Sequence, residues 1–259
     1  MKTSTILYAA LALEAGVLGC QNENAAPRRE QPVAGFAGGK DLPTAANDPA
    51  PSPSIIGVNT MHADDGRLAK MVIGILATDG FDQEELVEPR QAFASEGATT
   101  IILSTRTGTI QGYHDDTKGD MVKVDTSIVD VTTRAFDALL LPGGILNGER
   151  MRLDPGVTSF VRSFVQSGKP IAAICYGLWP LVEVDVVRGR TLTSCPSLRT
   201  DLKNAGAKWV DQDVVEDRNL VTSRGPDDIP AFNAKAMSLF AKRRSAQPPA
   251  IGGGPASTQ

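Results

Sequence analysis

The stretch from residue 169 to residue 181, KPIAAICYGLWPL, constrains the fold more than any other part of the chain. Its apolar run over residues 171–174 is typical of a strand buried on both faces of a parallel sheet. The residues after Gly177 have the apolar spacing of a helix start. Cys175 lies between the two, so we expect a sharp strand-to-helix turn that lifts its side chain clear of the sheet.

The turn allows two interpretations of Cys175. As a nucleophile, it would face main-chain amides at the helix start, which favour the thiolate and lower its pKa. We would then expect it to be the first thiol that iodoacetamide modifies near neutral pH. As a structural residue, it would behave as a small buried hydrophobe. This stretch alone leaves both interpretations open.

The first 20 residues differ in composition from the rest of the chain. A positive start at Lys2, a mostly apolar run and the ending Val-Leu-Gly-Cys resemble a bacterial lipoprotein signal. Cys20 would then carry the lipid, and the protein would lie in the cell envelope or periplasm. Glu14 within the apolar run favours the alternative, a poorly ordered extension of a cytoplasmic protein.

The remaining chain divides into three segments. Residues 21–69 are rich in Ala, Pro, Gly, Asn and Asp without a sustained period, which predicts a flexible tether. Residues 244–259 have a similar composition and predict a disordered tail. Residues 70–243 are then the folded domain, long enough for a single core.

Overall charge and the rarer residue types exclude several classes of function. The net charge is −4 with 41% hydrophobic residues, so we expect no nucleic-acid partner, and membrane contact only through Cys20. The two histidines, His62 and His114, and the three scattered cysteines form no metal-binding pattern. We therefore expect no metal and no cofactor.

Strands and helices alternate along residues 70–243. We expect strands at 71–76, 99–104, 138–141, 171–174 and 207–210, helices at 84–96, 157–165, 197–205 and 227–243, and hairpins at 108–126 and 214–222. This alternation predicts a doubly wound α/β fold, with a mostly parallel sheet sandwiched by helices. Ligands of such sheets bind beyond the carboxyl ends of the strands, where the loops 77–85, 142–149 and 175–179 would converge.

These three loops carry groups suited to nucleophilic catalysis. The first supplies acidic side chains between residues 79 and 85, which by themselves would also suit a solvated helix start. Gly143 and Gly144 supply main-chain N–H groups free of side chains, fit to bind an oxyanion. Cys175 supplies the nucleophile, and a nearby carboxyl would set its reactivity.

At this point the chain resembles the PfpI family, which belongs to the superfamily of PfpI endopeptidase and the parkinsonism-associated protein deglycase and is similar to class I glutamine amidotransferases. The matching motifs, which span residues 71–241, are Gly80-Phe81-Asp82-x-x-Glu85-Leu86, Leu141-Pro142-Gly143-Gly144, Ile174-Cys175, Pro196-Ser197-Leu198, Asn204-Ala205-Gly206-Ala207 and Ser223-Arg224-x-Pro226-Asp227-Asp228. The resemblance implies a flavodoxin-like fold.

The resemblance also assigns roles to individual residues. Cys175 matches the nucleophile, and Glu85 matches the acid that hydrogen-bonds its sulfur. Gly144 and the Tyr176 amide match the oxyanion-binding backbone. Glu149 matches a third triad member that family peptidases receive from a neighbouring subunit, which implies a homo-oligomer.

Two positions depart from the family pattern. Peptidase-like members have histidine directly after the cysteine, whereas this chain has Tyr176, whose phenol is a poor base at neutral pH. Cys195 stands where the family usually has tyrosine near the pocket. It would either approach Cys175, where an oxidising compartment would allow a disulfide, or fill buried space.

Three functions remain open at this stage. The first is a hydrolase or glyoxalase-like lyase in which Cys175 attacks a reactive carbonyl or its adduct on a small molecule or protein, as in glyoxalase and deglycase relatives. The second is a redox-sensing stress protein that oxidises Cys175 without turnover. The third is a cysteine peptidase, which Tyr176 disfavours.

Overall fold

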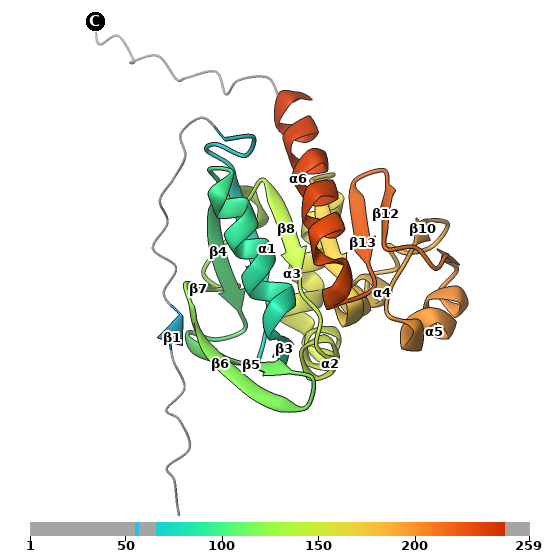
Figure 1. Cartoon of the computed structure of the whole chain (residues 1–259), viewed down its shortest axis with the longest axis horizontal. Helices are drawn as coiled ribbons and strands as arrows, with labels where there is room; N and C mark the ends of the chain where they lie inside the picture. Colours follow the sequence, from blue (N-terminus) through green and yellow to red (C-terminus); the bar gives the residue numbers. More distant parts are fainter. Residues whose placement is uncertain (1–54, 57–65, 247–259) are drawn as a thin grey trace, which may run out of the picture. The chain divides into compact units, whose positions relative to one another are not determined.

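The computed structural model describes residues 55–56 and 66–246, with side chains from residue 66 to residue 242 (Figure 1). The predicted lipoprotein signal with Cys20 lies outside these residues. So do His62, most of the predicted tether and the end of the predicted tail.

A seven-stranded sheet forms the centre of the fold, in the order β12-β13-β9-β8-β2-β4-β7. Its strands are β2 (Val72–Leu76), β4 (Thr99–Ser104), β7 (Thr126–Ser127), β8 (Ala138–Leu141), β9 (Ile171–Ile174), β12 (Val214–Asp217) and β13 (Leu220–Ser223). Every neighbouring pair is parallel except β12 and β13. This confirms the predicted doubly wound α/β architecture.

Helices cover both faces of the sheet because the buried strands are apolar on both sides. On one face lie α1 (Gln83–Ser95) and α6 (Ile229–Ala246), side by side in Figure 1, with the Phe93 and Phe240 rings 5.5 Å apart. On the other lie α2 (Ile145–Leu153), α3 (Pro155–Gln166), α4 (Trp179–Glu183) and α5 (Arg199–Asn204). Strand β8 packs Leu140 toward the first face and Leu139 toward the second.

Short elements complete the fold at its edges. The predicted hairpin at 108–126 is β5 (Gly108–His114) and β6 (Thr117–Val124); β3 (Phe81–Asp82) pairs with β5, and β1 (Ile55–Ile56) pairs with β6. Strands β10 (Thr191–Leu192) and β11 (Lys208–Trp209) pair separately. The 3-10 turns are η1 (Thr133–Ala135), η2 (Cys175–Leu178), η3 (Pro196–Leu198) and η4 (Pro226–Asp228).

The packed region extends beyond the predicted bounds of 70 and 243. Leu68 is fully buried and belongs to the core beneath α1. The Leu68 N–H donates to the Glu96 carbonyl at 2.8 Å, and the Arg67 guanidinium pairs with the Glu96 carboxylate at 2.8 Å. At the other end, α6 continues to Ala246. Among the described residues, no helix is both long and apolar enough to span a membrane.

Leu68→Ala tests whether this segment belongs to the folded unit. Because the side chain is fully buried, truncation should lower the free energy of unfolding by about 2–5 kcal/mol. Urea unfolding followed by circular dichroism measures this, with Val129→Ala as a control, since Val129 is 79% exposed. Equal stability of both variants and the unmodified protein would place Leu68 in a tether.

Candidate active site

The loops after β2, β8 and β9 meet at the carboxyl edge of the sheet, as predicted, and Asn147 joins two of them. This fully buried amide donates to the Pro142 and Gly143 carbonyls at 2.9 and 3.0 Å. Its oxygen accepts from the Thr78 N–H at 2.7 Å. The role of Asn147 was not predictable from the sequence, because a single polar residue after a glycine pair carries no periodic signal.

Cys175 occupies a strained turn directly after β9. It is the first residue of η2 and has a φ of 53°, a left-handed conformation that a side chain disfavours. Gly177 makes the turn fit, since a Cβ there would strike the Leu141 carbonyl and lie 2.9 Å from the Pro142 oxygen. The predicted strand-to-helix turn is therefore present.

Glu85 reaches this turn from the first turn of α1. The Asp82 carboxylate caps that helix and accepts from the Glu84 and Glu85 N–H groups, both at 3.1 Å. The Glu85 side chain is fully buried, and Oε2 accepts from the Gly143 N–H at 2.7 Å. Oε1 has no hydrogen-bond partner among the described residues, and the nearby Cys175 thiol acts to lower the pKa of this carboxyl.

The two glycines after β8 have different roles. A Cβ on Gly143 would strike Glu85 Oε2 and lie 2.8 Å from the Cys175 Cβ, so only glycine fits between them. Its N–H donates to Glu85, so an oxyanion at Gly143 would have to displace that carboxyl, and the predicted role of Gly143 stays a prediction. Gly144, with a φ of 92°, precedes α2, and among the described residues no hydrogen bond engages its N–H.

The Glu85 carboxyl is a weaker acid than an exposed glutamate. Burial raises its pKa well above the ordinary value, and the Asp82 charge adds to this effect. The hydrogen bond from Gly143 acts in the opposite direction without reversing it. The carboxyl therefore keeps its proton to an unusually high pH.

Cys195, which departs from the family pattern, lies near Cys175. Both cysteines are partly buried and free, and each shifts the pKa of the other. The neighbouring Cys175 lowers the pKa of Cys195 most, and the hydrogen bond from the Ser197 hydroxyl to the Cys195 sulfur at 3.3 Å adds to this effect. Together they outweigh burial and bring the pKa of Cys195 to about 7.

The pKa of Cys175 moves the other way. The neighbouring Cys195 raises it most, followed by burial and the Glu85 charge, and the Tyr176 N–H offsets only part of this. The first two causes act whatever the protonation state of Glu85. The expected depression of the Cys175 pKa is therefore not found, because the neighbouring Cys195, burial and the Glu85 charge all raise it.

Tyr176 does not replace the missing histidine. Its phenol hydrogen-bonds the Ser197 hydroxyl at 2.7 Å, and its ring lies 4.8 Å from that of Trp179. Burial raises the pKa of the phenol, which makes it less able to exchange a proton at neutral pH. The main-chain N–H of Tyr176 points to the Cys175 sulfur.

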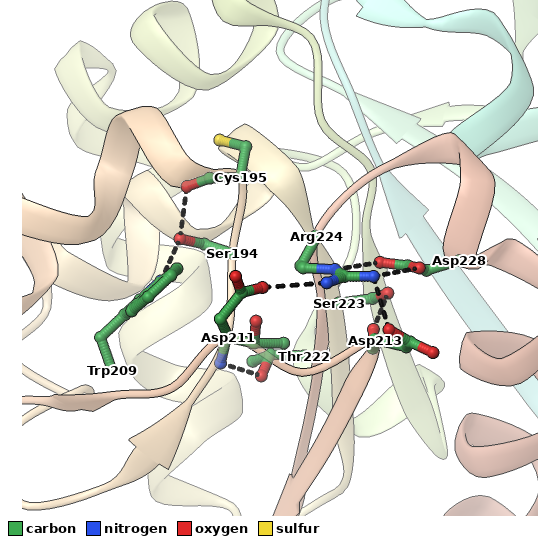
Figure 2. Close-up of polar contacts among 10 residues, drawn as sticks. Ser194, Cys195, Trp209, Asp211, Asp213, Thr222, Ser223, Arg224 and Asp228 are labelled. Atoms are coloured by element: carbon green, nitrogen blue, oxygen red, sulfur yellow. Dashed lines mark hydrogen bonds and ion pairs between the residues drawn. The ribbon is translucent and has the colours of Figure 1, made fainter.

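An arginine cluster fixes the loop that covers Glu85. Figure 2 shows the Arg224 guanidinium reaching Asp211 on one side and Asp228 on the other, with nitrogen–oxygen distances of 2.9 and 2.8 Å. It also pairs with Asp213. The next residue, Gly225, lies over the carboxyl, since a Cβ there would be 4.0 Å from Glu85 Oε1. The motif was visible in the sequence, but this role was not.

Glu149 is not brought to Cys175 within the chain. It is exposed on α2, and the described residues show no hydrogen bond or ion pair between it and Cys175. A contribution from a neighbouring subunit stays a prediction.

His114 is half-exposed, and its Nδ1 lies 3.6 Å from the Glu84 carboxylate. No cluster of acidic, histidine or cysteine residues in the described part is arranged to hold a metal.

Glu85→Gln should change how stability depends on pH. The folded protein keeps the Glu85 proton above the ordinary pKa of 4.5, at which the unfolded chain releases it. The stability present below pH 4.5 is therefore lost as pH rises toward the folded pKa, with a slope approaching about 1.4 kcal/mol per pH unit.

Urea unfolding of both proteins between pH 4 and pH 8 isolates this effect as a difference. The unmodified protein should lose stability relative to Glu85→Gln as pH rises. A difference that is constant, or that grows in favour of the unmodified protein, would contradict the raised pKa.

Comparisons with known proteins agree with this site. Residues 71–239 match the DJ-1/PfpI family. The chain is 44% identical over 170 residues to protein/nucleic acid deglycase 2 of Escherichia coli, covering 65% of this chain and 96% of that protein. It is 39% identical over 169 residues to the putative cysteine protease YraA of Bacillus subtilis, covering 65% and 97%. Drosophila melanogaster DJ-1beta, at 27% identity, superposes with a TM-score of 0.60 over 68% of this chain and 96% of that one. The chain therefore belongs to the DJ-1/PfpI family.

Proposed function

We propose that this protein is a cysteine-dependent hydrolase or lyase that acts on reactive carbonyls or their adducts, in the manner of a deglycase or glyoxalase, and protects against carbonyl stress. The observation that carries the proposal is the approach of the buried Glu85 carboxyl to the Cys175 side chain on either side of Gly143, beside a Gly144 N–H that no described protein group engages. An acid, a nucleophile and an oxyanion donor are the groups that addition to a carbonyl requires.

Each group has one task in this scheme. The Cys175 sulfur, held at the strained turn, attacks the carbonyl carbon of a 2-oxoaldehyde or its adduct. The Gly144 and Tyr176 N–H groups stabilise the negative charge that develops on the oxygen. Glu85 approaches the Cys175 side chain from its buried side and keeps it oriented toward the substrate.

The deglycase named among the relatives supports this substrate class, since the match covers almost all of that protein. The relative named as a putative cysteine protease raises the peptidase alternative. Here that alternative lacks its base, because the Tyr176 phenol is bound to Ser197 and no described histidine lies at the turn. Reversible oxidation without turnover is a second candidate, which the nearness of Cys195 to Cys175 favours.

Cys175→Ser should abolish turnover of methylglyoxal and of its adducts on a thiol and on an amine. A hydroxyl is far less nucleophilic than a sulfur at this position, so the loss should exceed about 10²-fold. Disappearance of methylglyoxal and formation of lactate measure the reaction, with Val129→Ala as an active control on the exposed surface.

The same proteins are also tested for cleavage of a fluorogenic peptide and for oxidation by hydrogen peroxide. Turnover that survives in Cys175→Ser would remove the proposed function. Peptide cleavage by the unmodified protein would restore the peptidase alternative, and oxidation of Cys175 without carbonyl turnover would favour the redox protein.

A further inference from the structure

The direction of the Gly144 N–H is set by the peptide that it shares with Gly143. This peptide is trans, so the Gly143 carbonyl and the Gly144 N–H point in opposite directions. The carbonyl accepts two hydrogen bonds, from the Asp82 N–H at 3.1 Å and from Asn147 Nδ2 at 3.0 Å. The Gly144 N–H is therefore turned away from both donors, and no group among the described residues accepts from it.

The same peptide is packed between Cys175 and the loop after β2. A Cβ on Gly143 would lie 2.8 Å from the Cys175 Cβ. A Cβ on Gly144 would strike the Gly80 carbonyl and lie 2.7 Å from the Asp82 nitrogen. Because close neighbours on both sides limit sideways movement, the hydrogen bonds to the peptide carbonyl decide how the peptide plane is rotated.

Asn147 uses its whole hydrogen-bonding capacity at this position. Nδ2 donates to the Pro142 and Gly143 carbonyls at 2.9 and 3.0 Å. Oδ1 accepts from the Thr78 N–H at 2.7 Å and from the Thr78 hydroxyl at 3.1 Å. Since carbonyls only accept and a main-chain N–H only donates, the amide has one possible orientation. A fully buried amide with all four partners is a rigid support for the two carbonyls.

We propose that Asn147 is the positioning residue of the oxyanion site. Through the Pro142 and Gly143 carbonyls it holds the Gly144 N–H toward the oxygen of a carbonyl group that Cys175 attacks. The inference rests on the proposed function, in which this N–H stabilises the negative charge on that oxygen. Asn147 acts through the main chain, since all of its side-chain hydrogen bonds in the described residues go to Thr78, Pro142 and Gly143.

The Asp82 N–H is a second donor to the Gly143 carbonyl, so loss of Asn147 should weaken the positioning without abolishing it. Removal of an entire oxyanion donor costs about 10²–10³-fold in kcat, and loss of Asn147 should cost less, about 10–10²-fold. The loss should fall on kcat rather than on KM, because the N–H is needed where charge develops in the transition state.

The first test compares two reactions of Cys175 in the full chain. Methylglyoxal turnover creates an oxyanion, whereas alkylation by iodoacetamide displaces iodide from a saturated carbon and creates none. Asn147→Leu, which removes all four hydrogen bonds at similar volume, should lower kcat for turnover by about 10–10²-fold and leave the alkylation rate unchanged. Thr78→Val is the matched control, because it removes only the hydroxyl bond to the same amide and should leave both reactions unchanged.

The second test uses Asn147→Asp, which keeps the size and shape of the side chain. An ionised carboxylate cannot donate to the Pro142 and Gly143 carbonyls, whereas a protonated carboxyl can donate to one of them. The turnover of this variant relative to the unmodified protein should therefore rise as pH falls from 8 to 5. For Asn147→Leu the same ratio should not depend on pH. Taking the ratio removes the titration of Glu85 and Cys175, which all three proteins share.

The outcomes separate positioning from a structural role and from the proposed function. Equal losses of alkylation and turnover in Asn147→Leu would overturn the proposal, because the variant would then have disturbed the site as a whole. Unchanged kcat in Asn147→Leu would overturn it too and leave the proposed function standing. If Asn147→Leu does not fold, as circular dichroism would show, the pH dependence of Asn147→Asp decides, and a constant ratio contradicts the proposal. Normal alkylation of Cys175 without carbonyl turnover in the unmodified protein removes the proposed function and with it this role.

Discussion

The approach of the buried Glu85 carboxyl to Cys175 across Gly143 is the constraint on which the site depends. Glu85 is fully buried, and its Oε2 is fixed by the Gly143 N–H at 2.7 Å. Gly143 must be glycine, because a Cβ would lie 2.8 Å from the Cys175 Cβ and strike the carboxyl. The Asp82 cap, the Asn147 amide and the Arg224 cluster each hold one of the loops that surround these two side chains.

Packing these acids together determines where charge can reside. A buried carboxyl and two nearby thiols cannot all ionise near neutral pH, since each charge raises the pKa of its neighbours. The Cys195 sulfur has the Ser197 hydroxyl as a donor, whereas Cys175 has the Tyr176 N–H and a carboxyl beside it. The pKa of Cys195 is lowered by these surroundings, whereas the neighbouring Cys195 and burial raise that of Cys175.

Much of the fold was predictable because buried parallel strands are continuous apolar runs. The strands at 99–104, 138–141 and 171–174 have the bounds that the sequence predicts. Helix α2 was missed, because it exposes Ile145, Leu146 and Leu153 and contains Gly148, so it has no clear apolar stripe.

The site was predictable as far as local chemistry determines it. The strained turn at Cys175 and the approach of an acid from the loop after β2 follow from motif and topology. The mutual effect of the two cysteines on their pKa values does not, because it depends on residues twenty positions apart in the chain. Whether Cys195 approaches Cys175 or only fills buried space could be decided only from the packing around Ser197 and Leu198.

The most direct measurement is a carbon-13 NMR titration of the full chain with Cys20→Ser and ¹³Cβ-labelled cysteine, assigned with the two single serine variants. The structure predicts that the Cys195 Cβ resonance titrates with an apparent pKa of about 7. The Cys175 resonance should then show only the small change induced by its neighbour. A Cys175 resonance that moves to the thiolate position near neutral pH, with Cys195 remaining a thiol, would contradict the account.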